Sequence, residues 1–203
     1  MASAQRPQPL EWGAATRTRR GEDDGGDLAL VTRTSRGTLI AAIDGAGHGV
    51  EAARAAHAGA AVLRDHAGDE LSTLLVRCHE RLRQTRGAAM CLAFFPAELS
   101  VMTWLGIGDV QGAVVPGDGA DPRPKRALCL AGGVVGFELP TLRQETLEIG
   151  RGDVVVLATD GIRASFVDSL LLAGSPQAIA DRAVAAHWKP TDDGLVLVVR
   201  YLG

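Results

Sequence analysis

Short apolar runs separated by turns recur along most of the chain and predict a protein rich in β-strands. Runs of strand length, bounded by glycine, proline and acidic residues, lie at about 27–31, 38–43, 90–95, 99–105, 110–115, 127–130, 142–149, 154–159 and 195–199. From residue 89 onward the runs are close together with no helix-length segment between them, which is typical of antiparallel strands. The proline- and glycine-rich segment 116–124 is therefore predicted to be a hairpin loop and not a domain linker.

Two segments with a period near 3.6 residues predict helices between the second and third strands. Residues 50–66 are rich in alanine, and the next segment places apolar residues at Leu71, Leu74, Leu75, Cys78 and Leu82. Those five positions follow an i, i+3, i+4, i+7, i+11 spacing, so this helix is expected to pack its apolar stripe on a sheet. Two further helices are predicted at about 162–172 and 176–188.

Length and composition favour a single domain at residues 10–203, which follows a disordered tail at 1–9. The chain has 203 residues, of which 46% are hydrophobic, and a formal net charge of -3. Nucleic-acid-binding proteins usually carry an excess of positive charge, and this chain has none. No apolar run approaches the ~20 residues of a membrane span, and the polar start is unlike a signal peptide. A cytoplasmic protein with no nucleic-acid or membrane partner is expected.

The three cysteines agree with an intracellular location. Cys78, Cys91 and Cys129 are an odd number, have no C-x-x-C spacing and lie in apolar segments. They are predicted to be small core residues, with no role in chemistry.

Candidate chemistry lies at aspartates next to the apolar runs. Asp44-Gly45 and Asp160-Gly161 each end such a run, and Asp192-Asp193-Gly194 stands directly before the last one. A carboxylate at the end of a buried strand is costly to desolvate unless a cation lies against it, and carboxylate oxygens select Mg²⁺ or Mn²⁺. Each pair alone is also a common turn signal. Together they predict a shared metal site for hydrolysis.

These residues and their surroundings resemble a known family, the metal-dependent PPM (type 2C) serine/threonine protein phosphatases. The resemblance covers roughly residues 12–201 and is strongest to the bacterial RsbX-like and SpoIIE-like branch of sigma-factor and stressosome regulation. Its most specific parts are a D-G-x-G-H-G stretch and a G-D-x-x-x-L-x-T-D-G stretch. The matching segments are Gly26-Asp27, 44–49, 106–109, 150–161 and 192–194.

The resemblance implies a fold and a set of metal ligands. The expected fold is α+β, a four-layer αββα sandwich in which helices flank two antiparallel β-sheets. Two Mn²⁺ or Mg²⁺ ions are expected, with a weaker third. The two catalytic residues are expected to be Asp44, which would bridge both ions, and Asp160, which would also hold the pair. The other implied roles are ligation through the Gly45 carbonyl, binding of the second ion by Asp192, an indirect contact from Asp27, and the third ion at Asp109. Whether Asp192 or Asp193 is the direct ligand stays open at this point.

The implied activity is hydrolysis of phosphoserine or phosphothreonine in a regulatory protein of the stressosome or anti-sigma antagonist type. Many family members carry a histidine directly after the first Asp-Gly, whereas this chain has Ala46 there and His48 two residues on. His48 is expected to support the helix entry more than catalysis. Because residues 132–143 are too few for a flap, exposed surface around the metals is expected to select the substrate.

Two alternatives belong to other classes of protein. The chain could be a catalytically weak module that keeps this fold to bind a phosphorylated partner, although none of the expected carboxylates is replaced. It could also be an unrelated α/β hydrolase or structural domain with fortuitous Asp-Gly turns.

Overall fold

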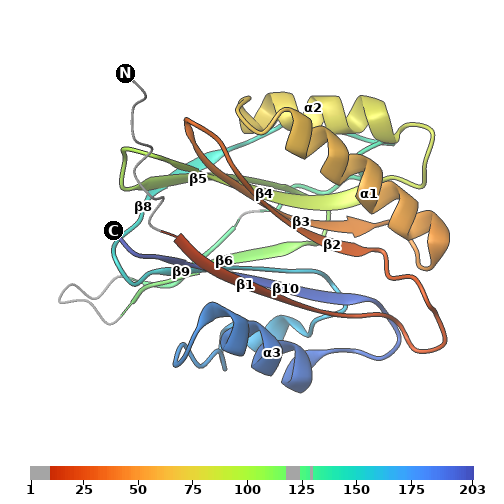
Figure 1. Ribbon diagram of the computed structural model, residues 1–203. Coiled ribbons are helices and arrows are strands. Elements are labelled where there is room, and N and C mark those ends of the chain that lie inside the picture. Colours follow the sequence, from red (N-terminus) through yellow and green to blue (C-terminus); the bar gives the residue numbers. More distant parts are fainter. Residues whose placement is uncertain (1–9, 118–123, 129) are drawn as a thin grey trace.

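Two five-stranded antiparallel sheets pack face to face in the computed structural model, which describes residues 10–117, 124–128 and 130–203 (Figure 1). The tail predicted at 1–9 and most of the predicted loop 116–124 lie outside these residues. The first sheet has the order β1 (Leu10–Arg17), β10 (Gly194–Tyr201), β9 (Val154–Ala158), β6 (Gln111–Val115), β7 (Arg126–Ala127). The second has the order β2 (Asp27–Arg33), β3 (Gly37–Gly45), β4 (Ala88–Pro96), β5 (Val101–Ile107), β8 (Glu145–Glu148).

Helices cover the outer faces of both sheets and complete four layers. Figure 1 shows α1 (Val50–Asp65) and α2 (Leu71–Leu82) on the second sheet, and α3 (Pro176–His187) on the first. Three apolar clusters fill the spaces between successive layers. The central strands are covered on both faces, so they are continuous apolar runs instead of alternating ones. The predicted αββα sandwich is confirmed.

The amphipathic stripe of α2 packs as its spacing predicts. All five of its apolar positions are buried, and they join the cluster between the helices and the second sheet. Cys78 and Cys91 are buried in the core as expected, while Cys129 lies outside the described residues. No helix among the described residues is long and apolar enough to cross a membrane.

The helix predicted at 162–172 is wrong. Only a short 3₁₀ turn, η1 (Ala164–Val167), forms there. Side chains satisfy the backbone of the following segment, because Arg182 and Arg200 donate to carbonyls between residues 171 and 174. The Ser169 hydroxyl also donates to Phe166 O, which competes with helical hydrogen bonds. Helix α3, in contrast, begins as predicted, with Ser175 as its N-cap.

Strand β1 has no counterpart in the sequence prediction. It pairs along its whole length with β10, and the backbone at Gly13 lies so close to α3 that a Cβ there would be 2.3 Å from Gln177 N. The strand predicted at 127–130 is reduced to the two residues of β7, and the one at 142–149 to the four of β8.

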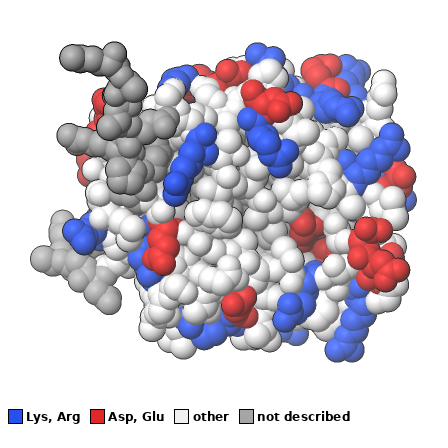
Figure 2. All heavy atoms as spheres, in the orientation of Figure 1, with Lys and Arg blue, Asp and Glu red and all other residues white. Residues whose placement is uncertain are grey.

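Acidic and basic side chains are interspersed on the face seen in Figure 2, and this face shows no extended patch of one sign.

Candidate metal centre

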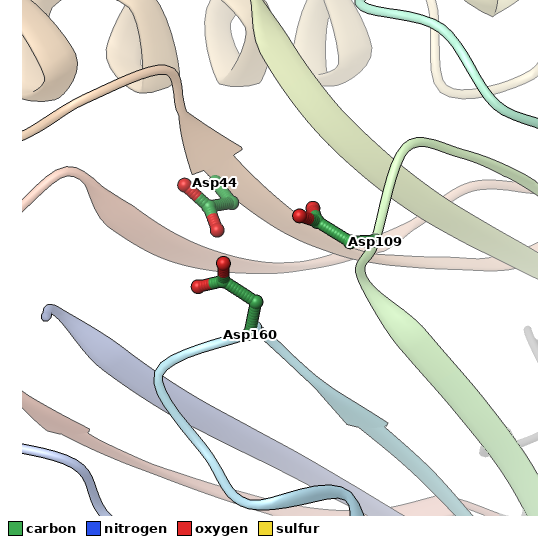
Figure 3. A group of neighbouring side chains, drawn as sticks. All are labelled: Asp44, Asp109 and Asp160. Carbon is green, nitrogen blue, oxygen red and sulfur yellow. The ribbon is translucent and has the colours of Figure 1, made fainter.

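Three carboxylates converge where ends of the two sheets meet. Asp44 lies at the end of β3, Asp160 directly follows β9, and Asp109 lies in the turn between β5 and β6. One oxygen of each lies within 4.8 Å of one oxygen of the other two. Figure 3 shows the three side chains pointing toward one another from three separate segments. Distant parts of the sequence therefore form one acidic cluster.

The cluster lines an open pocket of about 530 Å³. Its other walls are the turn Ala46–His48, the segment Gly132–Val134, and the side chains of Arg19 and Asp192. An open pocket lined by carboxylates suits a charged group on a larger molecule better than an enclosed apolar ligand.

Asp27 stands behind the cluster and not in the pocket lining. Its position opposite Asp44 follows from the antiparallel register of β2 and β3. The Thr159 hydroxyl donates to the Asp27 carboxylate at 2.7 Å and accepts from Leu195 N–H at 2.8 Å. Thr159 is fully buried and is a residue that the sequence analysis did not single out, although it directly precedes Asp160. It connects β2, β9 and β10 below the site.

Burial and mutual repulsion raise the carboxyl pKa values of the cluster. Burial raises the pKa of Asp44 to about 9, with further contributions from the charges of Asp27, Asp160 and Asp109. Burial also raises the pKa of Asp27 to about 7, against the opposing effect of its hydrogen bond from Thr159. The pKa of Asp160 is raised by burial and by Asp109 and Asp192, and lowered by Lys189.

This electrostatic situation fits a divalent ion. Each carboxylate in the pocket raises the proton affinity of its neighbours, so the ionised cluster is unfavourable without added positive charge. The donors are oxygens, as Mg²⁺ and Mn²⁺ prefer. Asp44, Asp109 and Asp160 would hold such an ion, and the nearby charge of Asp192 contributes to the raised pKa of Asp44 and of Asp160.

The two aspartates before β10 have different environments. Asp192 is half-buried and lines the pocket. Asp193 is 4% exposed, and its carboxylate accepts the N–H groups of Arg19 at 2.8 Å and Gly26 at 2.7 Å. Asp193 therefore holds the chain that leads into β2. Of the two, only Asp192 faces the pocket, and its ligation of a metal stays a prediction.

Gly45 is required by packing. A Cβ at this position would lie 2.0 Å from Ala52 O in α1, so no larger residue fits. Its N–H donates to Gly26 O at 3.0 Å. Ligation through its carbonyl stays a prediction, as do the ligand roles of the five aspartates.

His48 lies in the pocket wall and is tied to the acidic turn before β2. Its Nδ1 is 2.9 Å from Oε1 of Glu22, and its side chain is 46% exposed. The contact joins two loops at the pocket, and support of the helix entry by His48 stays a prediction. His57 and His66 are exposed on or at the end of α1, whereas His79 accepts a hydrogen bond from Gly136 N–H at 3.0 Å.

We expect the metal-free protein to lose stability as the pH rises from about 4 toward 9. The folded pKa values of Asp44 and Asp27, about 9 and about 7, lie above their ordinary value of 3.8. Between these pH values the folded state therefore binds more protons than the unfolded state. The stabilisation by these two protonated carboxyl groups is fully present below the unfolded-state pKa, and it is lost as the pH rises through the folded-state pKa values. Urea unfolding in EDTA at several pH values measures this, with Asp44→Asn as comparison. An equal pH dependence in wild type and variant would contradict the assignment.

The chain is similar to known proteins in sequence and in fold. The family model of Stage II sporulation protein E (SpoIIE) matches residues 34–202. One similar solved structure is described with the words "The bacterial stressosome: a modular system that has been adapted to control secondary messenger signaling". Its sequence is 26% identical and its TM-score is 0.84, and the match covers 94% of this chain and 99% of that one. RsbX in complex with magnesium is 17% identical, with a TM-score of 0.83 and 94% of both chains covered.

A third similar structure contains the PP2C phosphatase domain of SpoIIE from Bacillus subtilis. It is 18% identical with a TM-score of 0.75, and the match covers 95% of this chain and 64% of that one. The comparison with curated protein sequences gave no match.

Proposed function

The chain belongs to the SpoIIE family of PPM phosphatases, and from that premise we propose that it hydrolyses phosphoserine or phosphothreonine in a regulatory phosphoprotein. The observation that carries the proposal is the convergence of Asp44, Asp109 and Asp160 in an open pocket between the sheet ends. The same aspartates that the motifs single out are brought together by the fold. This family membership also removes the alternative of an unrelated hydrolase with fortuitous turns.

The proposed metal set is two Mn²⁺ or Mg²⁺ ions held by Asp44, Asp109, Asp160 and Asp192, with Asp27 supporting from behind. Divalent ions in such a site supply Lewis acidity, which lowers the pKa of water and offsets the charge of a phosphoryl group. The chain's own contribution is to fix the carboxylates. Thr159 orients Asp27, and the backbone contacts of Asp193 hold the chain before β2 in place.

Other side chains at the pocket are suited to the substrate. Arg19 lines the same pocket as the acidic cluster, and a guanidinium there is suited to bind phosphoryl oxygens. His48 lies in the pocket wall but is occupied by Glu22 at 2.9 Å, so protonation of the leaving serine or threonine oxygen is assigned to water. A protein nucleophile is not needed in this scheme.

The partner is proposed to be a folded regulatory protein of the stressosome or anti-sigma antagonist type, phosphorylated on serine or threonine. Support comes from the similar structures, which include one described under the bacterial stressosome and one of the RsbU and RsbW domains of Rv1364c from Mycobacterium tuberculosis. The open pocket allows a residue on a protein surface to enter. Action in the cytoplasm is part of the proposal, since unpaired cysteines persist there. The catalytically weak binding module is the second candidate, and turnover decides between them.

We expect hydrolysis of a phosphoserine peptide only with Mn²⁺ or Mg²⁺, complete loss in EDTA, and no loss after treatment with iodoacetamide. Burial raises the pKa of the Cys78 thiol to about 12 and that of Cys91 still higher, so neither is an accessible thiolate. Phosphate release measured with each metal, with EDTA and after alkylation tests this. Turnover in EDTA would overturn the two-metal assignment, inactivation by alkylation would indicate a cysteine mechanism, and metal binding without turnover would favour the binding module.

A further inference from the structure

Two exposed side chains stand at the edge of the metal pocket without a role in the site described above. Arg86 precedes β4 and is exposed, and Phe137 is 67% exposed, one of the most exposed large apolar side chains among the described residues. Both lie against loops that line the pocket. Large exposed apolar groups next to an active site are a recurrent mark of a binding surface.

Arg86 extends over the turn that forms one pocket wall. Its Nη1 lies 2.7 Å from the position that a Cβ of Gly47 would occupy, and Gly47 has φ +90. Gly47 is thus doubly constrained, by its left-handed backbone and by the guanidinium above it. The Ala46 N–H donates to Gly87 O at 2.9 Å, which fixes the Arg86-Gly87 turn to the same wall.

The charge of Arg86 is available for a partner. Within the parts of the chain that the structure describes, no carboxylate lies within 4.0 Å of its guanidinium, whereas Arg77 and Arg83 on α2 and at its end pair with Asp69 and Glu80. Arg86 is also absent from the pocket lining, where Arg19 is present. Its guanidinium therefore lies against the Gly47 turn but is not part of the pocket lining.

Phe137 lies against Gly87, the residue after Arg86, and belongs to a well-anchored loop. A Cβ at Gly87 would lie 3.0 Å from Cδ2 of Phe137 and 2.7 Å from Cγ1 of Val134, a pocket-lining residue. The Phe137 N–H donates to Val134 O at 2.9 Å, and the preceding Gly136 N–H donates to Nδ1 of His79 in α2. The exposed ring is thus presented on a fixed backbone, which lowers the entropy cost of binding through it.

We propose that Arg86 and Phe137 form a docking surface for the stretch of substrate polypeptide next to the phosphorylated residue, and that this surface selects an acidic side chain accompanied by an apolar one. The inference rests on the proposed phosphatase function and names its substrate preference. Charge complementarity carries it: the unpaired guanidinium donates hydrogen bonds to a carboxylate, while the phenyl ring packs on the apolar neighbour. Its position outside the pocket places the contact beside the phosphorylated residue and not on it.

A charge-swap experiment tests the acidic preference. Two series of phosphoserine peptides are compared, one with a single glutamate and one with a single lysine. In each series the charged residue is placed in turn at each of the four positions on either side of the phosphoserine, and the two peptides with the same position are compared. Wild type is expected to favour glutamate over lysine at one position by about fivefold in kcat/KM, and the difference should lie in KM. The expected effect is small and is measured at low salt because exposed ion pairs are weak and are screened by salt. Arg86→Glu should invert the preference to lysine. Arg83→Glu, a matched change at an arginine paired with Glu80, should keep it.

The apolar part is tested with the preferred peptide carrying leucine or serine beside the glutamate. Phe137→Ala should abolish the leucine preference, which we expect to be about fivefold since only part of the ring becomes buried. Leu171→Ala, also highly exposed at 69% but beyond the other sheet, should retain it. Thermal melting followed by circular dichroism verifies the fold of each variant. If Arg86→Glu does not fold, Arg86→Gln replaces it, and this variant should remove the charge preference without reversing it.

Failure of the docking surface is distinguishable from failure of the function. Hydrolysis of p-nitrophenyl phosphate by wild type with Mn²⁺ tests the function without any peptide contact. If that reaction proceeds and no peptide position shows a charge preference, or Arg86→Glu leaves the preference unchanged, the docking surface is wrong. If wild type hydrolyses neither p-nitrophenyl phosphate nor any peptide, the phosphatase proposal fails and the preference inferred from it fails too.

Discussion

Asp44→Asn is expected to lower kcat/KM for a phosphoserine peptide with Mn²⁺ by about a thousandfold or more, a loss of roughly 4 kcal/mol of transition-state stabilisation. The side chain keeps its size but loses the charge at the centre of the cluster, within 4.8 Å of Asp109 and Asp160. Steady-state kinetics over a range of Mn²⁺ concentrations separates lost metal affinity from lost turnover. Asp160→Asn is expected to have the same effect.

The fold of the Asp44→Asn variant should remain intact and become more stable without metal. Without metal, burial and the charges of Asp27, Asp160 and Asp109 disfavour the ionised form of Asp44, so folding at neutral pH must be accompanied by proton uptake. Asparagine has no such cost, so the melting temperature in EDTA should rise, by about 2 to 4 °C for each kcal/mol gained. Asp181→Asn, an exposed change on α3 away from the pocket, serves as the control for both measurements. Activity of Asp44→Asn within tenfold of wild type would remove Asp44 from the site.

The neighbouring aspartates before β10 should respond in opposite ways to the same substitution. Asp193→Ala is expected to lower the free energy of unfolding by about 3 kcal/mol, because two backbone N–H groups, of Arg19 and Gly26, lose a buried charged acceptor. Asp192→Ala should leave the free energy of unfolding in EDTA unchanged or raise it, while it weakens Mn²⁺ binding at least tenfold. Urea unfolding and isothermal titration of Mn²⁺ measure the two effects.

The pair of variants forms its own control, since the chemical change is identical at adjacent positions. Strong destabilisation by Asp192→Ala together with normal stability of Asp193→Ala would reverse the assignment of the two residues. Equal loss of metal binding in both, with wild-type stability, would make Asp193 a ligand as well.

The acidic cluster was predictable from sequence where a single strand ends in a carboxylate. The apolar runs before Asp44 and Asp160 determine both the strand and the point at which the side chain emerges, so periodicity and turn chemistry locate them. Their convergence with Asp109 depends on how the two sheets stack, and only the resemblance to a known family indicated it. Local pattern alone carries no information on that packing.

The failures have a common physical origin in contacts distant in sequence. Strand β1 forms because β10 supplies a full set of pairing partners and α3 covers Gly13, neither of which the sequence of residues 10–17 reveals. The segment 162–172 has a plausible helical composition, yet arginines from α3 and β10 satisfy its carbonyls in an irregular path. Asp193 could not be separated from Asp192 because adjacent residues differ only in the direction that the tertiary structure gives them.

The division of the carboxylates between two sheets has a mechanical consequence. Asp44 belongs to the sheet that carries α1 and α2, and Asp160 follows a strand of the other sheet, so their separation is set by side chains such as Ile40 and Leu157 in the layer between. A cation bound by both would cross-link the sheets much as a disulfide links two chain segments. Sliding of one sheet on the other would open this cross-link, so core packing remote from the pocket would tune cation affinity.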